Sequence, residues 1–247
     1  MKTIGIIGGL GPMATVYFME RITQMVDVKT DQEHPRIFLQ SIPDTPDRTA
    51  YILGQSRENP LPVLIKAGRE LSAMGADFIT IPCVTAQYFY PELCKALDIP
   101  VLSLCGNIAK DIAKKQIKKV GIMATSGTIQ SKVLEKEFRD VGVDVVIPAA
   151  PMQEEVMQII YQQVKSGAPV HWDSFLRVAD SLQEQGAERI ILGCTELSVL
   201  KREAGSEPDT RLHRMLDDRC VDVLDVLAQK AVLESGAPLK KEYQDVI

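Results

Sequence analysis

The sequence predicts an α/β fold made of two similar halves, each built around a parallel sheet. Short apolar runs alternate with longer amphipathic stretches along the 247 residues, which is typical of parallel strands joined by crossover helices. The same order of patterns restarts near the middle of the chain. In each half, an apolar run also ends on a cysteine that is closely followed by a threonine.

In the first half, continuous apolar runs that close on glycine, proline or polar residues indicate buried strands. Longer stretches with apolar residues at helical spacing indicate the helices between them, and one of these stops at Gly75. We therefore expect strands over 3–9, 36–42, 77–83 and 100–104, and helices over 14–26, 59–75, 88–97 and 105–116.

The second half echoes the first at two places. "KKVGIMATSGT" (118–128) is similar to "KTIGIIGGLGP" (2–12), and "QEQGAERIILGCTE" (183–196) is similar to "SAMGADFITIPCVT" (72–85). Gly121 follows Gly5 by 116 positions, and Cys194 follows Cys83 by 111. Such self-similarity indicates two related halves. Glycines coincide easily between unrelated α/β segments, so the cysteines are the more specific part of the echo.

Composition excludes several classes of protein. Apolar residues make up 45% of the chain and charged residues 25%, with a net charge of −5 and no long block of one sign. A nucleic-acid-binding protein would show a clustered basic face, and a membrane span would need roughly 18 consecutive apolar residues. The five cysteines form neither a CxxC pair nor a disulfide framework, so we expect no metal site and a cytoplasmic location.

The two echoed cysteines are the best candidates for chemistry. Ligand sites in open α/β sheets lie beyond the carboxyl ends of the strands, where both Cys83 and Cys194 fall. A helix N-terminus after each cysteine would lower its thiol pKa. Cys94, Cys105 and Cys220 have no echo and are interpreted as small, buried apolar residues.

Two equivalent thiols that face one cleft suit the inversion of a carbon centre. One thiolate removes a proton from one face, and the other thiol returns a proton to the opposite face. Covalent attack assisted by histidine is less favoured, because His34, His171 and His213 occupy no echoed position.

The turns that precede the first helix of each half are candidate anion sites. Backbone N–H groups at such strand ends suit carboxylates, although glycines at these positions also serve simply to allow a tight turn. The residues concerned are Gly8, Gly9, Thr125, Ser126, Gly127 and Thr128.

In its motifs the chain resembles the aspartate/glutamate racemase family, whose members work without pyridoxal phosphate. The resemblance covers nearly the whole chain and is carried by "IGIIGGLGPMAT" (4–15), "IPCVTA" (81–86), "VGIMATSGT" (120–128) and "LGCTE" (192–196). Two further stretches, "DQEHP" (31–35) and "IPDTPDRTAYILG" (42–54), are similar to the aspartate racemase branch.

The resemblance implies two pseudo-symmetric, flavodoxin-like domains with the active site in the cleft between them. It implies that Cys83 and Cys194 are the two acid–base residues, that no cofactor is used, and that the substrate is an acidic amino acid or dicarboxylate. It also implies that the C-terminal segment completes the first domain. We therefore expect one domain over 1–105 plus 210–247 and the other over 106–209.

In the aspartate branch, the positions that match Arg48 and Lys165 are associated with the side-chain carboxylate of the substrate. A guanidinium fork suits that role. The alternatives are that Lys165 merely complements a helix end and that Arg48 lies in a solvated loop. The neighbours of the cysteines, Val84, Thr85 and Thr195, complete the expected substrate-binding set.

The chain departs from the family at two positions. The usual first motif is Pro-Cys-Asn-Thr-Ala-His, whereas Val84 stands here for the asparagine and Gln87 for the histidine. Valine cannot hydrogen-bond the reacting amino acid, and loss of such a contact typically costs about 1–3 kcal/mol. Glu196, close after Cys194, would raise the pKa of that thiol if it lies near.

Three functions remain open from the sequence. The first is an aspartate-type racemase. The second is an isomerase or lyase that acts on a small dicarboxylate without an amino group, for which the missing asparagine would not matter. The third is a dicarboxylate-binding relative without turnover. The resemblance also suggests a homodimer, and residues 235–247 form either a loose end or a partner-contacting arm.

Overall fold

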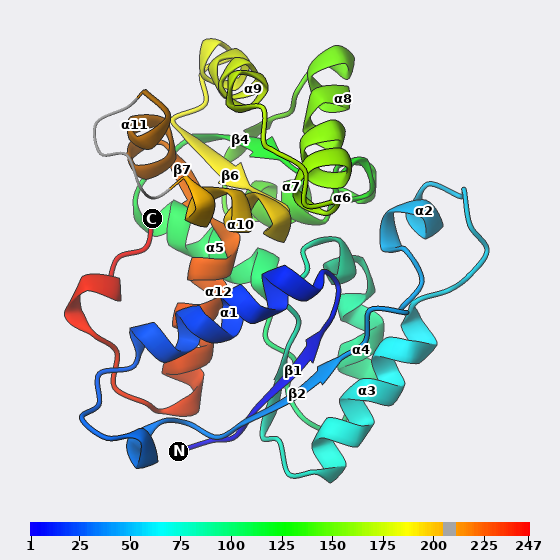
Figure 1. Cartoon of the computed structure of the whole chain (residues 1–247), viewed down its shortest axis with the longest axis vertical. Coiled ribbons are helices and arrows are strands. Elements are labelled where there is room, and N and C mark those ends of the chain that lie inside the picture. The colour runs from blue at the N-terminus through cyan, green and yellow to red at the C-terminus, as the bar shows by residue number, and fades with distance from the viewer. Residues whose placement is uncertain (205–210) are drawn as a thin grey trace.

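The computed structural model describes residues 1–204 and 211–247 of the chain (Figure 1). Its strands form two parallel sheets, which confirms the predicted α/β fold. The first sheet has the order β2-β1-β3 and the second the order β5-β4-β6-β7. The strands are β1 (Ile4–Gly8), β2 (Ile37–Ser41), β3 (Phe78–Thr80), β4 (Lys119–Met123), β5 (Asp144–Val146), β6 (Arg189–Leu192) and β7 (Cys220–Asp222).

Helices join the strands and cover the sheets. Around the first sheet lie α1 (Pro12–Met25), α2 (Arg48–Ile52), α3 (Leu61–Ala73), α4 (Tyr90–Ala96) and α5 (Leu104–Lys114), with 3₁₀ turns at Asp31–Glu33 and Thr85–Phe89. The second half contains α6 (Ser126–Ser131), α7 (Val133–Asp140), α8 (Ala150–Gln158), α9 (Trp172–Glu184), α10 (Thr195–Glu203) and α11 (Arg211–Asp218), and α8 continues into a π-helix at Ile159–Val164. The chain ends with α12 (Val223–Ser235) and a 3₁₀ turn at Lys241–Tyr243.

The repeat extends to backbone packing. A Cβ atom on Gly5 would lie 3.0 Å from the Cβ of Ala76, and one on Gly121 would lie 3.2 Å from that of Ala187. Each of these alanines follows a glycine with positive φ that ends a helix. The central strand of each sheet therefore approaches the start of its neighbour closely enough that only glycine fits.

The two halves share one hydrophobic core. Ile4 and Ile6 of β1 belong to the same buried cluster as Val120 and Ile122 of β4, and helices α1, α5 and α12 fill the space between the sheets. Figure 1 shows α12 running from the second half down to the first, where it packs against α1. Two further clusters lie on the outer faces of the sheets.

Two elements differ from expectation. The predicted strand over 100–104 is reduced to a single bridge between Val101 and Ile79, because Ser103 already caps α5. Strand β7 pairs with β6, so residues up to Asp222 extend the second sheet, although we expected 210–247 to join the first half. The division into domains stays a prediction, and residue 210 itself lies outside the described part of the chain.

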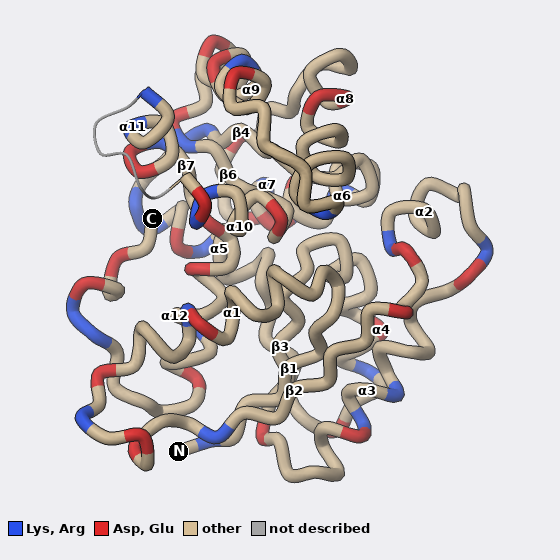
Figure 2. The backbone as a smooth tube through the Cα atoms, viewed as in Figure 1, with Lys and Arg blue, Asp and Glu red and all other residues tan. Residues whose placement is uncertain are grey.

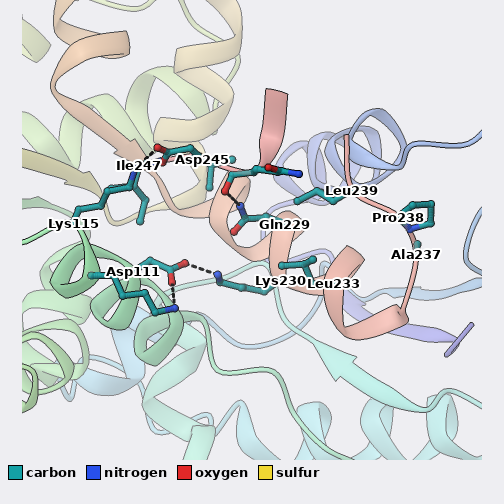
Figure 3. A pocket seen from close by; sticks show the side chains of 13 residues that line it. Asp111, Lys115, Gln229, Lys230, Leu233, Ala237, Pro238, Leu239, Asp245 and Ile247 are labelled. Atoms are coloured by element: carbon teal, nitrogen blue, oxygen red, sulfur yellow. Dashed lines mark hydrogen bonds and ion pairs between the residues drawn. The ribbon is translucent and has the colours of Figure 1, made fainter. Parts of the chain in front are cut away.

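The C-terminal segment packs against its own chain. The Asp27 amide donates to the Pro238 carbonyl, and the buried side chain of Gln229 donates to the carbonyls of Tyr243 and Gln244. A cavity of about 610 Å³ lies between α5, α12 and the tail, and Figure 3 shows the side chains that line it. Its lysines and aspartates are largely paired with one another, as between Lys230 and Asp111. The tail is therefore tied down rather than loose.

Charged residues of both signs are scattered over the outer helices and loops, while the strands of the first sheet carry almost none (Figure 2). No helix among the described residues is both long enough and apolar enough to span a bilayer.

Candidate active site

Cys83 and Cys194 line the same buried cavity between the two halves. Cys83 follows β3 by way of Ile81 and Pro82, while Cys194 directly precedes the first turn of α10. Both cysteines are free and almost fully buried. The cavity they share has a volume of about 10 Å³, which is room for about one water-sized group. This volume is smaller than the space we expected for a small molecule between the thiols.

Charged groups surround Cys194. Its thiol donates to Oε2 of Glu196, with 2.8 Å between sulfur and oxygen, and Glu196 Oε1 lies 3.4 Å from Nζ of Lys165. Burial raises the pKa of the Cys194 thiol well above its usual value, and the Glu196 carboxylate raises it further, while Lys165 opposes the change. The helix N-terminus was expected to lower this pKa, but burial and the carboxylate outweigh it. Cys194 is therefore a protonated thiol at neutral pH.

Lys165 is held by this carboxylate. Burial acts to lower the pKa of its ammonium, but Glu196, followed by the nearby thiols and Tyr161, raises it to about 12. The ammonium also lies 4.6 Å from the centre of the Tyr161 ring. Lys165 thus stays charged and partly sheltered, with 27% of its side chain exposed.

The four residues that directly follow Cys83 are uncharged. Val84 is packed into the core shared by both halves and offers no polar atom. The side chain of Gln87 is buried, and its Oε1 accepts from the Leu104 amide at the start of α5. At the two positions where the chain departs from its family, one residue fills space and the other caps a helix.

Three buried threonine hydroxyls join the halves beside the cysteines. Thr85 lies 3.1 Å from Thr125 and 3.0 Å from Thr128, and those two lie 3.1 Å from each other. Thr125 also caps α6 by accepting from the Thr128 amide. Thr85 and Thr125 line the cysteine cavity, as does the buried Thr195.

Arg48 also lines the cavity, but its guanidinium is engaged by the backbone. Nη1 donates to the carbonyls of Thr45 and Pro46, Nη2 donates to that of Leu10, and Nε is buried without a hydrogen bond. The side chain is almost fully buried rather than solvated. Any carboxylate that binds here would meet a guanidinium already fixed in place.

The candidate anion turns have structural partners. The Gly9 amide donates to the Thr15 hydroxyl, and a Cβ on Gly8 would lie 2.4 Å from the same side chain. A Cβ on Gly127 would lie 2.8 Å from Cα of Thr49, where α6 packs against α2. The Ser126 amide points to the sulfur of Met157. Of these residues, Gly9 lines a cavity next to the cysteines, which is described next.

A larger cavity of about 460 Å³ adjoins the one between the two thiols. Leu10, Asp47, Arg48, Lys165 and Glu196 line both. We call the larger space the outer cavity and the one between the thiols the inner cavity. Among these shared residues, the role of Leu10 and Asp47 was missed by sequence reasoning.

Tyr161 was also missed. Its hydroxyl, from the second half, lies 3.4 Å from Oδ2 of Asp47 in the first half, and both residues line the inner cavity. Burial raises the pKa of this phenol. Its spacing of four residues from Lys165 is a usable sequence signal, because such residues share a helix face.

Within residues 1–204 and 211–247, no cluster of three or more His, Cys, Asp or Glu side chains is placed to hold a metal ion. Cys105 and Cys220 are buried, as interpreted from the sequence, whereas Cys94 is exposed. The fold and site therefore define a two-sheet α/β protein with paired thiols enclosed between its halves.

The chain belongs to the Asp/Glu/hydantoin racemase family, whose sequence model matches residues 7–231. It is 28% identical over 211 residues to the broad specificity amino-acid racemase RacX of Bacillus subtilis, covering 83% of this chain and 89% of the relative. The aspartate racemase structure from Picrophilus torridus is 28% identical, with a TM-score of 0.82 and coverage of 99% and 98%. A glutamate racemase from Bacillus anthracis shares the fold at 19% identity, with a TM-score of 0.62 over 95% of this chain and 83% of that one. The chain is thus a member of an amino-acid racemase family.

Proposed function

We propose that the protein racemises an acidic amino acid, with aspartate favoured, by cofactor-independent proton transfer between Cys83 and Cys194. One observation carries the proposal: the cysteines come from equivalent strand ends of the two halves and line one buried cavity. The similarity to an aspartate racemase and to a broad specificity racemase supports the reaction class.

The geometry suggests a direction for the first half-reaction. Cys194, a thiol hydrogen-bonded to Glu196, serves as the proton donor in the resting protein. Cys83 acts as the base that removes the α-proton from the opposite face of the substrate, and the electron pair stays on the α-carbon until Cys194 returns a proton. The new Cys194 thiolate then lies beside the Glu196 carboxylate, so Lys165 is needed to offset the like charges.

Binding of the substrate requires the inner cavity to widen. Its volume of about 10 Å³ accepts one water-sized group, whereas an amino acid brings a carboxylate and an ammonium as well. We propose that the Tyr161–Asp47 contact opens to admit the substrate, with the three threonine hydroxyls and Arg48 available to its carboxylates.

Incubation with L-aspartate in D₂O tests the proposal. We expect deuterium at Cα by mass spectrometry together with loss of optical rotation. Turnover of fumarate or maleate without α-exchange would instead favour the dicarboxylate isomerase or lyase, which Val84 supports because such a substrate has no amino group to hold. Binding of aspartate without any exchange would favour the non-catalytic relative. The expected homodimer is checked by light scattering on the same sample.

A further inference from the structure

The outer cavity has the size of a binding site in its own right. At about 460 Å³ it falls within the range of small-molecule sites in proteins. It is contiguous with the inner cavity through the residues that line both, so a substrate whose α-carbon reaches the thiols extends its side chain into it.

Two of the charges at the junction of the two cavities are paired with each other, whereas the Arg48 guanidinium meets only neutral carbonyls. Lys165 faces Glu196, and Arg48 donates to three backbone carbonyls. Asp47 accepts from the Ala50 amide and from Tyr161. A side-chain carboxylate placed here must therefore compete for Lys165 with an existing carboxylate.

Glu196 itself opposes a second anion. Its Oε1 is buried without a hydrogen bond, although Lys165 lies within ion-pair distance of it. A Cβ on Gly11 would lie only 2.8 Å from this oxygen, so the carboxylate is directed toward the turn that borders the outer cavity. An anionic side chain entering past Gly11 would meet a like charge.

Beyond the junction, most side chains that line the outer cavity are apolar, and the hydroxyl of the one exception, Thr45, donates to the Ile42 carbonyl. Leu10 and Val199 are buried, and Val164 is half-buried. Met13 and Pro43 are exposed and lie along the rim. Each methylene buried against such walls strengthens binding by about fourfold.

We propose that the outer cavity is also a side-chain pocket for long apolar amino acids, so that the protein racemises methionine and leucine in addition to aspartate. The inference rests on the proposed two-thiol reaction and extends its substrate class. The methionine or leucine side chain lies along Leu10, Val164 and Val199, while the charged pairs at the junction remain intact.

The test measures deuterium incorporation at Cα in D₂O for L-alanine, L-aspartate, L-methionine and L-leucine. We expect exchange with methionine and leucine, with kcat/KM for each exceeding that for alanine by at least about tenfold, as two or more buried methylenes imply. Exchange of aspartate without exchange of methionine or leucine would overturn the inference and leave the proposed function standing. Absence of exchange with all four would refute the proposed function itself.

Two variants locate the side chain. Val199→Phe narrows the buried wall and should lower kcat/KM for methionine at least tenfold relative to alanine. Met13→Trp narrows the exposed rim without touching the core and should act in the same direction. Val16→Trp is the matched control, because Val16 is as exposed as Met13 on the same helix but does not line the cavity. Equal effects of Met13→Trp and Val16→Trp, or equal loss for all substrates in both cavity variants, would overturn the assignment.

Discussion

The two cysteines occupy equivalent places in the fold, yet their surroundings differ in charge. Cys194 has the carboxylate of Glu196 in contact and the ammonium of Lys165 behind it. Cys83 has Val84 packed into the core and Gln87 capping a helix. The repeated fold therefore places two thiols at equivalent strand ends, whereas the carboxylate in contact with Cys194 raises the pKa of that thiol. The asymmetry predicts that the two directions of proton transfer respond differently to mutation.

Removal of either thiol should have the largest effect. Cys83→Ser and Cys194→Ser should each lower racemisation by about 10³-fold or more, because a serine hydroxyl is too weak an acid and base. Each variant should still exchange the α-proton of one enantiomer with D₂O, since a single thiolate suffices to remove and return it. The exposed Cys94→Ser is the control and should be unchanged. Racemisation that persists in both active-site variants would contradict the two-thiol mechanism.

The Cys194 side also contains a second buried carboxylate. Asp222, opposite Leu192 in the strand pairing, accepts from Ser198 and from the Leu224 amide, while Oδ2 has no hydrogen bond. Burial, followed by the charge of Asp225, raises the pKa of Asp222 to about 6. The folded protein therefore holds this proton more tightly than the unfolded chain does.

The contribution of Asp222 to the free energy of unfolding should therefore be fully present below about pH 4. It should be lost as the pH rises through about 6. A shift of this size corresponds to about 3 kcal/mol. Asp222→Asn keeps the acceptor for Ser198 and should flatten this part of the pH profile in urea unfolding. Gln229→Glu, which buries a new carboxylate far from Cys194, should introduce a pH dependence of its own. If the free energy of unfolding of Asp222→Asn changes with pH as steeply as that of the wild type, the raised pKa of Asp222 is contradicted.

Glu196→Gln sharpens the comparison at the thiol itself. Loss of the carboxylate should lower the pKa of Cys194, because Glu196 is the largest charge that raises it. Alkylation of Cys194 by iodoacetamide at pH 8, after opening with low urea, should accelerate by about threefold for each unit of pKa lost, because the larger thiolate fraction is partly offset by a weaker nucleophile. Glu203→Gln, on the exposed end of α10, is the matched control. Slower alkylation in Glu196→Gln would contradict the assigned contact.

The smallest effect is expected at Val84. Val84→Asn restores a hydrogen-bonding group beside Cys83 and should raise aspartate turnover by about tenfold, since one polar contact is regained. Val84→Ala is the control, because it removes the packing of the valine side chain without adding a hydrogen-bonding group. Aspartate turnover that stays at zero in Val84→Asn, while the wild type processes another acid, would contradict the aspartate assignment.

Much of this comparison could be predicted from the sequence. The glycines and cysteines of the echo indicate strand ends, and strand ends of parallel sheets converge at one edge. The contact between Cys194 and Glu196 follows from their closeness in sequence. The prediction of a strand over 100–104 was wrong, because Ser103 caps helix α5 instead. The pairing of β7 with β6 was not predicted, because it joins segments almost 30 residues apart and no local sequence pattern indicates such a partner.

The ion pair between Lys165 and Glu196 could not be predicted from local sequence patterns either, for a different reason. A π-helix at Ile159–Val164 precedes Lys165, and its wider turn rotates the following residues relative to an α-helix. Helical periodicity therefore places Lys165 and Tyr161 on one face but does not tell which way that face points. The expected release of Lys165 to a substrate carboxylate stays a prediction.

The core shared by both sheets also affects how the protein is made. Because β1 and β4 lie in one apolar cluster, neither half can complete its interior while the other is absent. A ribosome that has released only the first sheet exposes the surface that α5 and α12 will later cover, and Cys83 emerges without its counterpart. Because residues of both halves line the inner cavity, the two thiols come to share it only after the second half has packed against the first.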